Sequence, residues 1–484
     1  MQCGSVNPLV RRLLLLTLVA AGCESAPARA AEPSAWESGV RSALSARGLE
    51  GASLSALVVE RASGATLVGV NPDTALMPAS TQKVLTAVAA LSSFGPAHRF
   101  VTEVRASRPV GTDGAVGDLF VSGGDPALTS EQWWRLAADL RALGLREVRG
   151  DLVLDDGLFD EQRWHPSWAP VSARAYHAPV SAISANFGAF RVRVAPGAAP
   201  GEPLFAAIDP PVPYLRLLNE GRTGKRGSKP TLVVEREPLA GGELVRLTGS
   251  VPSGTLPDDV WRSVGDPVAY AAAVLRLQLE ANGIRVAGGV RRGAAAPGAG
   301  LLLAFEGLPL QQIASLFLKY SNNFLAECML RWLALGPTPA PNAPPASWEA
   351  GAAALRERLG TLGVPLGDAR LVDGSGLSRE NRVSARVLVE TLRRGDAQFA
   401  VGPELLAGLP IAALDGTLAR RAEGALGRVR AKTGSLDGVS SLAGFARSER
   451  GRDLVFAVIV NGAQRGDAAA SAALDGFAAA LVRD

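Results

Sequence analysis

The sequence predicts an α/β fold of the α+β kind, in which helices and strands at both ends of the chain enclose a β-rich middle. Two observations support this prediction. Helical and strand-like periodicities alternate before about residue 100 and resume after about residue 300, whereas short strand-like runs separated by Gly, Pro and Asp fill the region between. A length of 484 residues also fits about three domains.

The N-terminal part combines two helices with a hairpin. Helical periodicity covers residues 35–47, and alternating patterns predict strands over 53–60 and 65–70, separated by a short Ala-Ser-Gly turn. A second helical pattern covers 79–91 and ends before a Phe-Gly-Pro sequence. We therefore expect two strands and two helices before residue 100.

The middle of the chain is typical of small β-rich modules. A helix-and-strand unit at 267–289 closes this region, and the Ala-, Gly- and Pro-rich stretch 293–300 is interpreted as a return linker. The expected strands are 100–104, 119–122, 152–154, 190–194, 231–235 and 243–247.

The last third returns to longer elements. Residues 336–347 are proline-rich and predict a surface excursion. Helices are expected over 308–318, 323–335 and 468–482, and strands over 428–433, 439–447 and 453–461.

The charge balance argues against nucleic-acid binding. The chain has 50 basic and 46 acidic residues, and a net charge of +4 is small for its length. One basic run, Arg222 to Lys229, is interleaved with glycines and predicts a solvated loop, with an anion site as the alternative. Three histidines and three cysteines argue against a His/Cys zinc site, and we expect neither a metal nor another cofactor.

The N-terminus has the pattern of a secretory signal peptide over residues 1–30. Two arginines precede the apolar stretch 13–21, and Ala28-Arg29-Ala30 fits a cleavage site before residue 31. Alternatively, Cys23 would carry a lipid, because the three residues before it resemble a lipoprotein box. Elsewhere no apolar run reaches the roughly 20 residues of a membrane span. We therefore expect an exported, periplasmic protein without a transmembrane span in the mature chain.

Lysine is rare in this chain and therefore informative. Arginine supplies nearly all positive charges, and it cannot lose its proton near neutral pH, whereas a buried lysine can. A lysine in such a chain therefore marks a position where a residue that can lose its proton is required, and we expect functional lysines among these five. The five lysines are Lys83, Lys225, Lys229, Lys319 and Lys432.

The first motif is Ser80-x-x-Lys83 at the start of the helix over 79–91. A serine and a lysine three residues apart share a helix face, so the amine can reach the hydroxyl. Free backbone N–H groups in the first helical turn would stabilise an oxyanion. A neutral lysine can act as the base for a serine nucleophile, although an exposed helix face would give the same pattern.

Two further motifs follow the middle region. Ser321-x-Asn323 lies between two apolar helices and can combine a proton-relaying hydroxyl with a substrate-binding amide, or simply cap a helix. On a predicted strand, Lys432 and Thr433 can bind a carboxylate, and Gly434 would let a substrate backbone approach. The N–H of Ser435 would complete an oxyanion hole with that of Ser80.

With these motifs in this order, the chain resembles the class C low-molecular-mass penicillin-binding proteins, the D-alanyl-D-alanine carboxypeptidase/endopeptidase family. The resemblance covers essentially the whole mature chain. It implies a transpeptidase/β-lactamase-like domain with an antiparallel sheet flanked by helices, formed by residues 31–99 and 301–484. Two β-rich inserted domains would occupy 100–300. The resemblance includes the segments 117–119, 123–126, 176–181, 373–379 and 415–418.

This resemblance implies a mechanism on peptidoglycan stem peptides. Ser80 would be acylated by the penultimate D-alanine carbonyl and would release the terminal D-alanine. Lys83 would be the base, and Ser321 would relay the proton to the leaving amine. Asn323 would orient the substrate, and water would then hydrolyse the acyl-enzyme.

The resemblance also implies the remaining binding residues. Lys432 and Thr433 would hold the C-terminal carboxylate, and Arg379 would lie near the substrate pocket, with a surface charge as its alternative role. β-Lactams would act as covalent inhibitors, and D,D-endopeptidase activity would be a second activity implied by the resemblance. The stretch 171–174, where some relatives place an acid for the stem-peptide side chain, contains none here.

The same sequence is compatible with several alternative assignments. Tyr320-x-Asn322 would be the second motif of class C β-lactamases and related esterases. A class A β-lactamase would need a deacylating glutamate on a loop, and none stands out. A Ser-His-Asp hydrolase would need one of His98, His165 and His177, all in loop-like segments, although His177 could shape the pocket edge. The non-enzymatic alternative is a wall-binding scaffold, against which three intact motifs argue.

Overall fold

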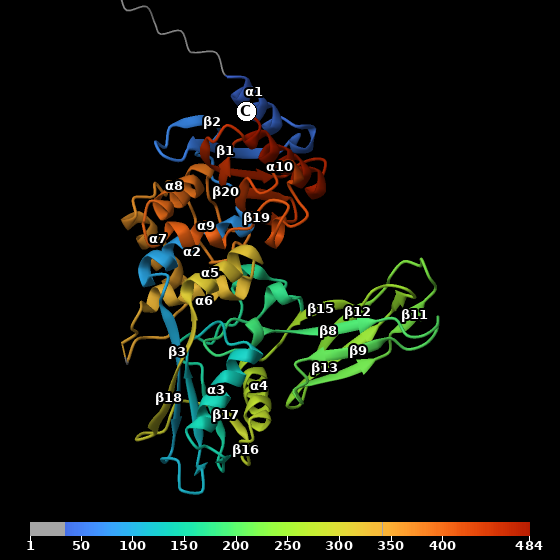
Figure 1. Ribbon diagram of the computed structural model, residues 1–484, viewed down its shortest axis with the longest axis vertical. Coiled ribbons are helices and arrows are strands. Elements are labelled where there is room, and N and C mark those ends of the chain that lie inside the picture. Colours follow the sequence, from blue (N-terminus) through green and yellow to red (C-terminus); the bar gives the residue numbers. More distant parts are fainter. Residues whose placement is uncertain (1–33, 341) are drawn as a thin grey trace, which may run out of the picture.

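A five-stranded antiparallel sheet joins the two ends of the chain (Figure 1). The structure is a computed structural model that describes residues 34–340 and 342–484. The sheet order is β19-β20-β21-β1-β2, so C-terminal strands lie beside the N-terminal hairpin and the expected strands at both ends are confirmed. These strands are β1 (Ser53–Glu60), β2 (Thr66–Val70), β19 (Val429–Leu436), β20 (Val439–Arg447) and β21 (Asp453–Asn461).

Helices cover both faces of this sheet because successive strand residues point to opposite sides. On one face Val58 and Phe456 pack in one apolar core with α1 (Ala35–Leu44) and α10 (Asp467–Val482). On the other face Leu57 belongs to the larger core that contains the remaining body helices. These are α2 (Gln82–Phe94), α5 (Leu310–Lys319), α6 (Asn323–Leu335), α7 (Trp348–Thr361), α8 (Ala385–Asp396) and α9 (Gly402–Gly408).

Helix α2 runs through the middle of the larger core. Every residue from Gln82 to Leu91 is buried, and most of them are Val, Leu or Ala, as expected for a helix that has no solvent-facing side. Lys83 is an exception in this apolar setting, because a lysine is almost never fully buried without a specific reason. The position of Lys83 therefore directs attention to its neighbours.

The chain between α2 and α5 forms a lobe and an arm (Figure 1). In the lobe, a five-stranded sheet of order β17-β7-β5-β3-β18 and a small sheet of order β16-β6-β4 share a core with two helices. The elements of the lobe are β3 (Arg99–Ala106), β4 (Ala115–Val116), β5 (Leu119–Gly123), α3 (Ser130–Ala142), β6 (Glu147–Val148), β7 (Leu152–Asp155), α4 (Pro267–Ala281), β16 (Arg285–Val286), β17 (Val290–Arg292) and β18 (Gly300–Pro309).

The arm is built only of strands and projects from the side of the molecule (Figure 1). Its three small sheets have the orders β15-β8-β9, β10-β13-β12 and β11-β14. The strands are β8 (Ala189–Ala195), β9 (Phe205–Asp209), β10 (Leu215–Asn219), β11 (Arg222–Gly224), β12 (Val233–Leu239), β13 (Gly242–Thr248), β14 (Ser250–Pro252) and β15 (Asp258–Ser263).

The predicted α/β class is confirmed, and so are the six strands expected in the middle region, but several elements differ. Strand β18 begins at Gly300 and pairs with β3, so the sheet of the lobe continues past the position where we expected the return to the first domain. Helix α3 lies in the region expected to be β-rich, and α7, α8 and α9 were not predicted. The domain boundaries themselves stay a prediction.

The N-terminal expectations fall on residues that the structure does not describe. The signal peptide over 1–30, its cleavage site and the alternative lipid attachment at Cys23 all lie outside the described residues. In the part of the chain that is described, no helix combines the length and apolar character needed to cross a membrane.

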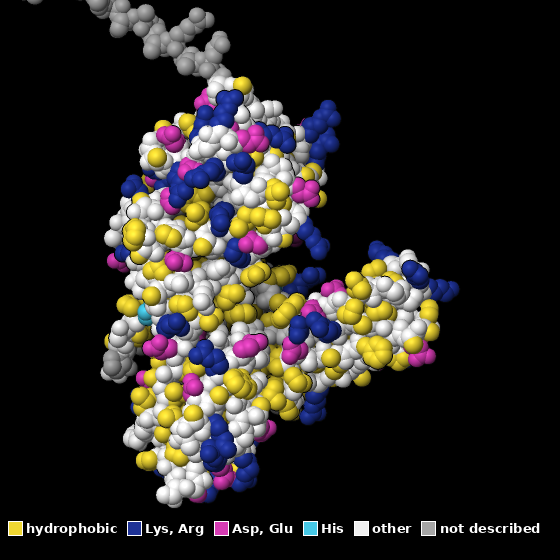
Figure 2. Space-filling view, viewed as in Figure 1, with side chains coloured by type: hydrophobic (Ala, Val, Ile, Leu, Met, Phe, Trp, Pro, Cys, Tyr) yellow, Lys and Arg dark blue, Asp and Glu magenta, His cyan; other side chains and the backbone are white. Residues whose placement is uncertain are grey.

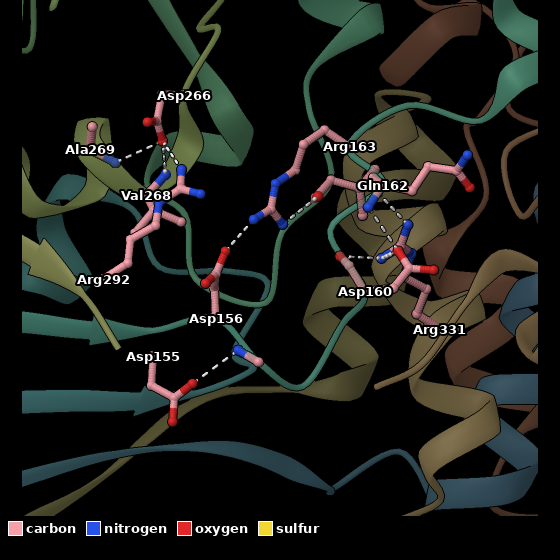
Figure 3. Close-up of polar contacts among 12 residues, drawn as sticks. Asp155, Asp156, Asp160, Gln162, Arg163, Asp266, Val268, Ala269, Arg292 and Arg331 are labelled. Carbon is pink, nitrogen blue, oxygen red and sulfur yellow. Dashed lines mark hydrogen bonds and ion pairs between the residues drawn. The ribbon is translucent and has the colours of Figure 1, made fainter. Parts of the chain in front are cut away.

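A buried arginine ties the loop after β7 to the body (Figure 3). The guanidinium of Arg331, on α6, donates to the carbonyl of Gln162 at 2.7 Å and lies 3.0 Å from the carboxylate of Asp160. It also stacks over the ring of Trp348 at 3.8 Å from the centroid, and its side chain is fully buried. Burial lowers the pKa of Arg331, so the charge depends on these partners.

We predict that Arg331→Ala lowers the free energy of unfolding by about 3 kcal/mol, because buried acceptors lose their donor. Urea denaturation followed by tryptophan fluorescence measures this, since Trp348 is in the same contact. The control is Arg285→Ala, which removes an exposed ion pair with Glu147 and should cost at most about 1 kcal/mol. Equal losses in the two variants would contradict the anchoring role.

Candidate active site

Ser80 lies in a strained turn at the start of α2. The turn is a short 3-10 helix, η2 (Ala79–Thr81), and the α-helix begins only at Gln82, slightly later than expected from the sequence. Ala79 has a φ of 48°, a left-handed conformation that a residue with a side chain adopts only when its surroundings enforce it. The carbonyl of Pro78 accepts hydrogen bonds from Thr81 at 2.7 Å and from Ser441 at 2.6 Å, and these bonds hold the turn.

Loop 373–379 approaches this turn so closely that one of its residues must be a glycine. A Cβ atom at Gly376 would overlap the carbonyl oxygen of Ala79, so only glycine fits there. Loop 373–379 therefore packs directly against the backbone next to Ser80. The turn that carries Ser80 is thus in direct contact with this loop.

The amine of Lys83 lies in the centre of the site. Its Nζ is 3.0 Å from Ser80 Oγ, 2.7 Å from Asn323 Oδ1 and 2.8 Å from the carbonyl oxygen of Ser375. Burial lowers the pKa of Lys83 to about 7, although the nearby carboxylates of Glu327 and Asp373 act in the opposite direction. A large fraction of this amine is therefore neutral at neutral pH and able to accept a proton.

Ser321 faces a second buried lysine. It lies between α5 and α6 with a φ of 59°, and its Oγ accepts a hydrogen bond from Lys432 Nζ at 3.0 Å. Asn322, not Ser321, caps α6 by accepting from Leu325 N. The helix-cap alternative for this motif is thus correct for Asn322, but Ser321 is not the capping residue. Burial, reinforced by the charge of Lys83, lowers the pKa of Lys432 well below its usual value.

Asn323 joins α6 to the segment from the middle of the chain. Its Oδ1 accepts from Lys83, and its Nδ2 donates to the carbonyl of Tyr176 at 2.9 Å. Tyr176 belongs to η4 (Ala175–His177), which contacts both α6 and β15. One wall of the site therefore comes from the region before the arm.

Strand β19 lies on the other side of Ser80. A Cβ atom at Gly434 would lie 2.8 Å from the carbonyl oxygen of Pro78 and 3.0 Å from Ser80 N. The sequence-based reason for this glycine, room for a substrate, is therefore incomplete, because glycine is already required by the turn next to Ser80. Thr433 Oγ1 lies 2.7 Å from Thr417 Oγ1, so segment 415–418 supports the strand.

These residues surround a cavity of about 580 Å³. Of the predicted site residues, Ser80, Ser321, Asn323, Arg379 and Ser435 line it, whereas Lys83, Lys432, Thr433 and Gly434 are buried behind them. All nine predicted residues thus belong to one region.

Arg379 lies at the mouth of this cavity. Its Nη1 donates to the carbonyl of Asp437 at 3.0 Å, which links loop 373–379 to the turn between β19 and β20. The guanidinium is exposed, and Asp437 also lines the cavity. Arg379 is therefore close to any ligand that enters the cavity.

Two buried acids were missed by the motif analysis. Glu327 accepts hydrogen bonds from the N–H groups of Gly374 and Ser375, at 3.0 and 2.8 Å. Asp373 accepts from Gly376 N at 2.8 Å and Ser378 N at 2.6 Å. Together they hold the loop whose carbonyl contacts Lys83. The available signal was a single glutamate in the apolar run 324–330, since such an acid requires partners when buried.

The alternative motifs do not meet at this cavity. Tyr320 is 67% exposed, and the side chain of Asn322 caps a helix, so the Tyr-x-Asn alternative lacks the required geometry. The ring of His98 makes an edge-to-face contact with Phe100, and His165 Nδ1 lies 2.7 Å from Ser167 Oγ.

His177 lines the cavity edge, as anticipated, but the nearest partner of its Nδ1 is Ser172. Among the described residues, no imidazole is hydrogen-bonded to Ser80. The geometry therefore offers Ser80 an amine, and no histidine, as its proton acceptor.

Comparison with known proteins gives the family. Residues 37–481 match the D-Ala-D-Ala carboxypeptidase 3 (S13) family. The chain is 36% identical over 469 residues to a D-alanyl-D-alanine carboxypeptidase of Actinomadura sp. (strain R39), an alignment that covers 93% of this chain and 85% of the relative.

A solved structure supports the same relationship. The crystal structure of penicillin binding protein 4 from Haemophilus influenzae superimposes with a TM-score of 0.76 at 28% identity, covering 91% of this chain and 98% of that one. The same protein has also been solved in complex with a novel β-lactam, with a TM-score of 0.71. The expected serine peptidase is thereby confirmed, and the chain belongs to the D-Ala-D-Ala carboxypeptidase 3 (S13) family.

Proposed function

We propose that this chain cleaves the terminal D-Ala-D-Ala bond of peptidoglycan stem peptides through an acyl-enzyme on Ser80. The observation that carries the proposal is the 3.0 Å distance between Ser80 Oγ and the Nζ of Lys83, a buried amine with a pKa of about 7. Membership of the D-Ala-D-Ala carboxypeptidase 3 (S13) family agrees with this substrate.

In the first step, neutral Lys83 accepts the proton of Ser80, and Oγ attacks the carbonyl carbon of the penultimate D-alanine. The carbonyl electrons move to its oxygen, and the N–H groups of Ser80 and Ser435 stabilise this oxyanion. The amide bond then breaks with a proton delivered to the leaving nitrogen through Ser321. The products are an ester on Ser80 and free D-alanine.

In the second step, water attacks the ester carbonyl while an amine of the site takes its proton. The ester bond breaks, Ser80 Oγ regains a proton, and the shortened peptide leaves as a carboxylate. The same chemistry can release the amine of a cross-linked neighbouring peptide in place of D-alanine. We therefore include D,D-endopeptidase activity in the proposal.

The remaining residues position the substrate. Lys432 and Thr433 bind its C-terminal carboxylate, and Asn323 donates an amide hydrogen bond to its backbone. Lys432 also donates to Ser321, which supports a proton path between the two. Arg379 contacts the substrate at the cavity mouth, where it already lies.

The proposal extends to β-lactams and to location. A β-lactam complex of the Haemophilus influenzae relative supports covalent acylation of Ser80 by penicillins here. A penicillin, like a peptide that ends in D-Ala-D-Ala, presents an amide beside a carboxylate, and in the penicillin this amide is strained. Because peptidoglycan lies outside the cytoplasmic membrane, and because of the N-terminal sequence pattern, we propose that the protein is exported, as a soluble protein or with a lipid at Cys23.

The first test uses Ser80→Ala. Wild-type protein should release D-alanine from a peptide ending in D-Ala-D-Ala and should be labelled by fluorescent penicillin. Ser80→Ala should lose labelling completely and reduce release at least about a thousandfold. Mass analysis of digested peptidoglycan fragments identifies carboxypeptidase and endopeptidase products separately. Ser228→Ala, on the arm, is the control. Release at the wild-type rate by Ser80→Ala, or rapid multiple turnover of nitrocefin by the wild type, would overturn the proposal.

The second test separates charge from basicity at Lys83. Lys83→Arg keeps a positive charge, but a guanidinium cannot accept the serine proton at neutral pH, so penicillin acylation should fall by about a thousandfold or more. Stopped-flow acylation kinetics measure the change, and circular dichroism checks the fold. The exposed Lys225→Arg is the matched control and should acylate at the wild-type rate. Retained acylation in Lys83→Arg would remove Lys83 as the base.

The third test is the pH dependence of acylation. Only neutral Lys83 accepts a proton, so the second-order rate constant for penicillin should rise about tenfold per pH unit at low pH. The rise should level off near pH 7, the lowered pKa of Lys83. Beyond its maximum the rate should fall as Lys432 loses its charge, because burial holds the pKa of Lys432 well below the usual value for a lysine. A profile that is flat through neutral pH, in protein that stays folded, would contradict this assignment.

A further inference from the structure

The far end of the arm is formed by two neighbouring turns. Strands β11 and β14 pair in parallel there, and each leads into an exposed turn, 225–229 and 253–257 respectively. The turns are linked by a hydrogen bond from Ser253 N to the carbonyl of Gly224 at 3.0 Å. We call these two turns, together with Arg222, the arm tip. The arm tip lies well away from the body of the molecule (Figure 1).

The arm tip carries four exposed cations: Arg222, Lys225, Arg226 and Lys229. Among the described residues, none of these four lies within ion-pair distance of an acid, and Figure 2 shows dark blue side chains gathered at this end of the arm. The basic run 222–229 was expected to be a solvated loop. This is correct for the exposed turn 225–229 and wrong for Arg222–Gly224, which form strand β11 with Thr223 buried.

The strands of the same arm are different. Arg191 and Arg193 lie 2.8 to 3.1 Å from the carboxylates of Asp209 and Asp259. Arg246 lies 2.7 Å from Glu220. Most strand arginines of the arm are therefore paired with acids, with Arg216 and Arg262 as exceptions, whereas none of the four cations of the tip is. Two of the five lysines of this arginine-rich chain lie in this tip.

A large apolar side chain accompanies these charges. Leu256, in the second turn, is 82% exposed. It lies two residues from Gly254, where a Cβ atom would be 3.9 Å from Arg226 Nε. Phe205 is 70% exposed at the start of β9. Pro203, two residues earlier, forms a backbone bridge with Arg222 of the arm tip. Exposure of large apolar side chains to water is unfavourable, and burying them against another surface would lower the free energy. The arm tip therefore has the features of a surface that binds a partner.

We propose that the arm tip binds an anionic lipid bilayer. Lysine and arginine side chains are attracted to lipid phosphates, and an apolar side chain between them can enter the boundary between headgroups and acyl chains. A soluble polyanion would account for the four cations and leave Leu256 unexplained. The combination of unpaired charge and exposed leucine therefore favours the bilayer.

Binding at the tip would also orient the candidate active site. Strand β15 of the arm contacts η4. The backbone of Arg262, on this strand, forms an antiparallel bridge with the backbone of Arg174, two residues before Tyr176. Tyr176 in turn accepts the hydrogen bond from Asn323. The arm is thus attached at the wall of the cavity, so a tip held at a lipid surface holds the cavity in a defined orientation to that surface.

The test is co-flotation with vesicles. The chain from residue 31 onward should bind phosphatidylglycerol-containing vesicles and not pure phosphatidylcholine vesicles, and added salt should weaken binding. Arg226→Gln/Lys229→Gln should reduce the partition coefficient by about tenfold or more, since each cation contributes a factor of about five. Leu256→Ser should reduce it several-fold without changing the charge.

The controls separate this proposal from its alternatives. Arg41→Gln/Arg47→Gln removes two exposed cations from the body, away from the arm, and should bind vesicles like the wild type. All variants should be acylated by penicillin at the wild-type rate, which shows that they are folded and that the result is independent of the proposed catalysis. Failure of the wild type to bind anionic vesicles would overturn the proposal. The proposal would also be overturned if Leu256→Ser bound anionic vesicles as strongly as the wild type does and soluble polyphosphate bound equally strongly. The tip would then recognise phosphate charge alone.

Discussion

The burial of the Lys83 amine is the interaction on which the rest of this site depends. Removing an ammonium group from water costs several kcal/mol. The amine of Lys83 is therefore stable in the protein interior only as a partly neutral group that is surrounded by hydrogen-bond acceptors. Its three partners are Ser80, Asn323 and the carbonyl of Ser375. These belong to the 3-10 turn, to α6 and to loop 373–379, so one lysine joins three segments that are far apart in sequence. Any change that lets water reach this amine would restore its usual basicity and loosen the three segments together.

The same buried space contains carboxylates, and their effect on the lysine is opposite to that of burial. Glu327 and Asp373 favour the charged amine, whereas desolvation favours the neutral one, and the pKa of about 7 results from both. The two acids are in turn held by backbone N–H groups of the loop next to Lys83. Burial raises the pKa of Glu327, because removing this carboxylate from water destabilises its charged form. The loop is therefore an electrostatic component of the site as well as one of its walls.

Local patterns predicted those parts of the structure whose cause is local. The hairpin of β1 and β2, the last three strands and α6 follow from alternation and periodicity within the segment itself. Strand β18 was missed because its partner, β3, lies about two hundred residues earlier, and no local pattern reports such a pairing. Helix α3 was a different case, since Trp133, Leu136, Ala137 and Leu140 are buried at helical spacing and the signal was present in the sequence.

The candidate site shows the same division. Spacing alone put Ser80 next to Lys83, because three residues along a helix return to the same face. It could not reveal that Gly434 is required by the turn at Pro78, nor that Glu327 supports loop 373–379, because both depend on segments that meet only in the folded chain. The motifs therefore identified the reacting groups, and the close contacts that hold these groups in place became visible only in three dimensions.

The long segment between α2 and α5 is part of the site and not an appendage to it. Its first and last strands pair with each other, Arg99 opposite Pro309, so the segment leaves and re-enters the body at one place and leaves the five-stranded sheet of the body uninterrupted. Before the arm begins, it contributes Trp168 to the body core and the Tyr176 carbonyl to Asn323. A site built from the body alone would lack this wall, and the Asn323 amide would lose the partner that fixes its orientation. The segment is therefore joined to the cavity by a direct hydrogen bond from Asn323 to Tyr176, and the contact of η4 with β15 joins this wall to the arm.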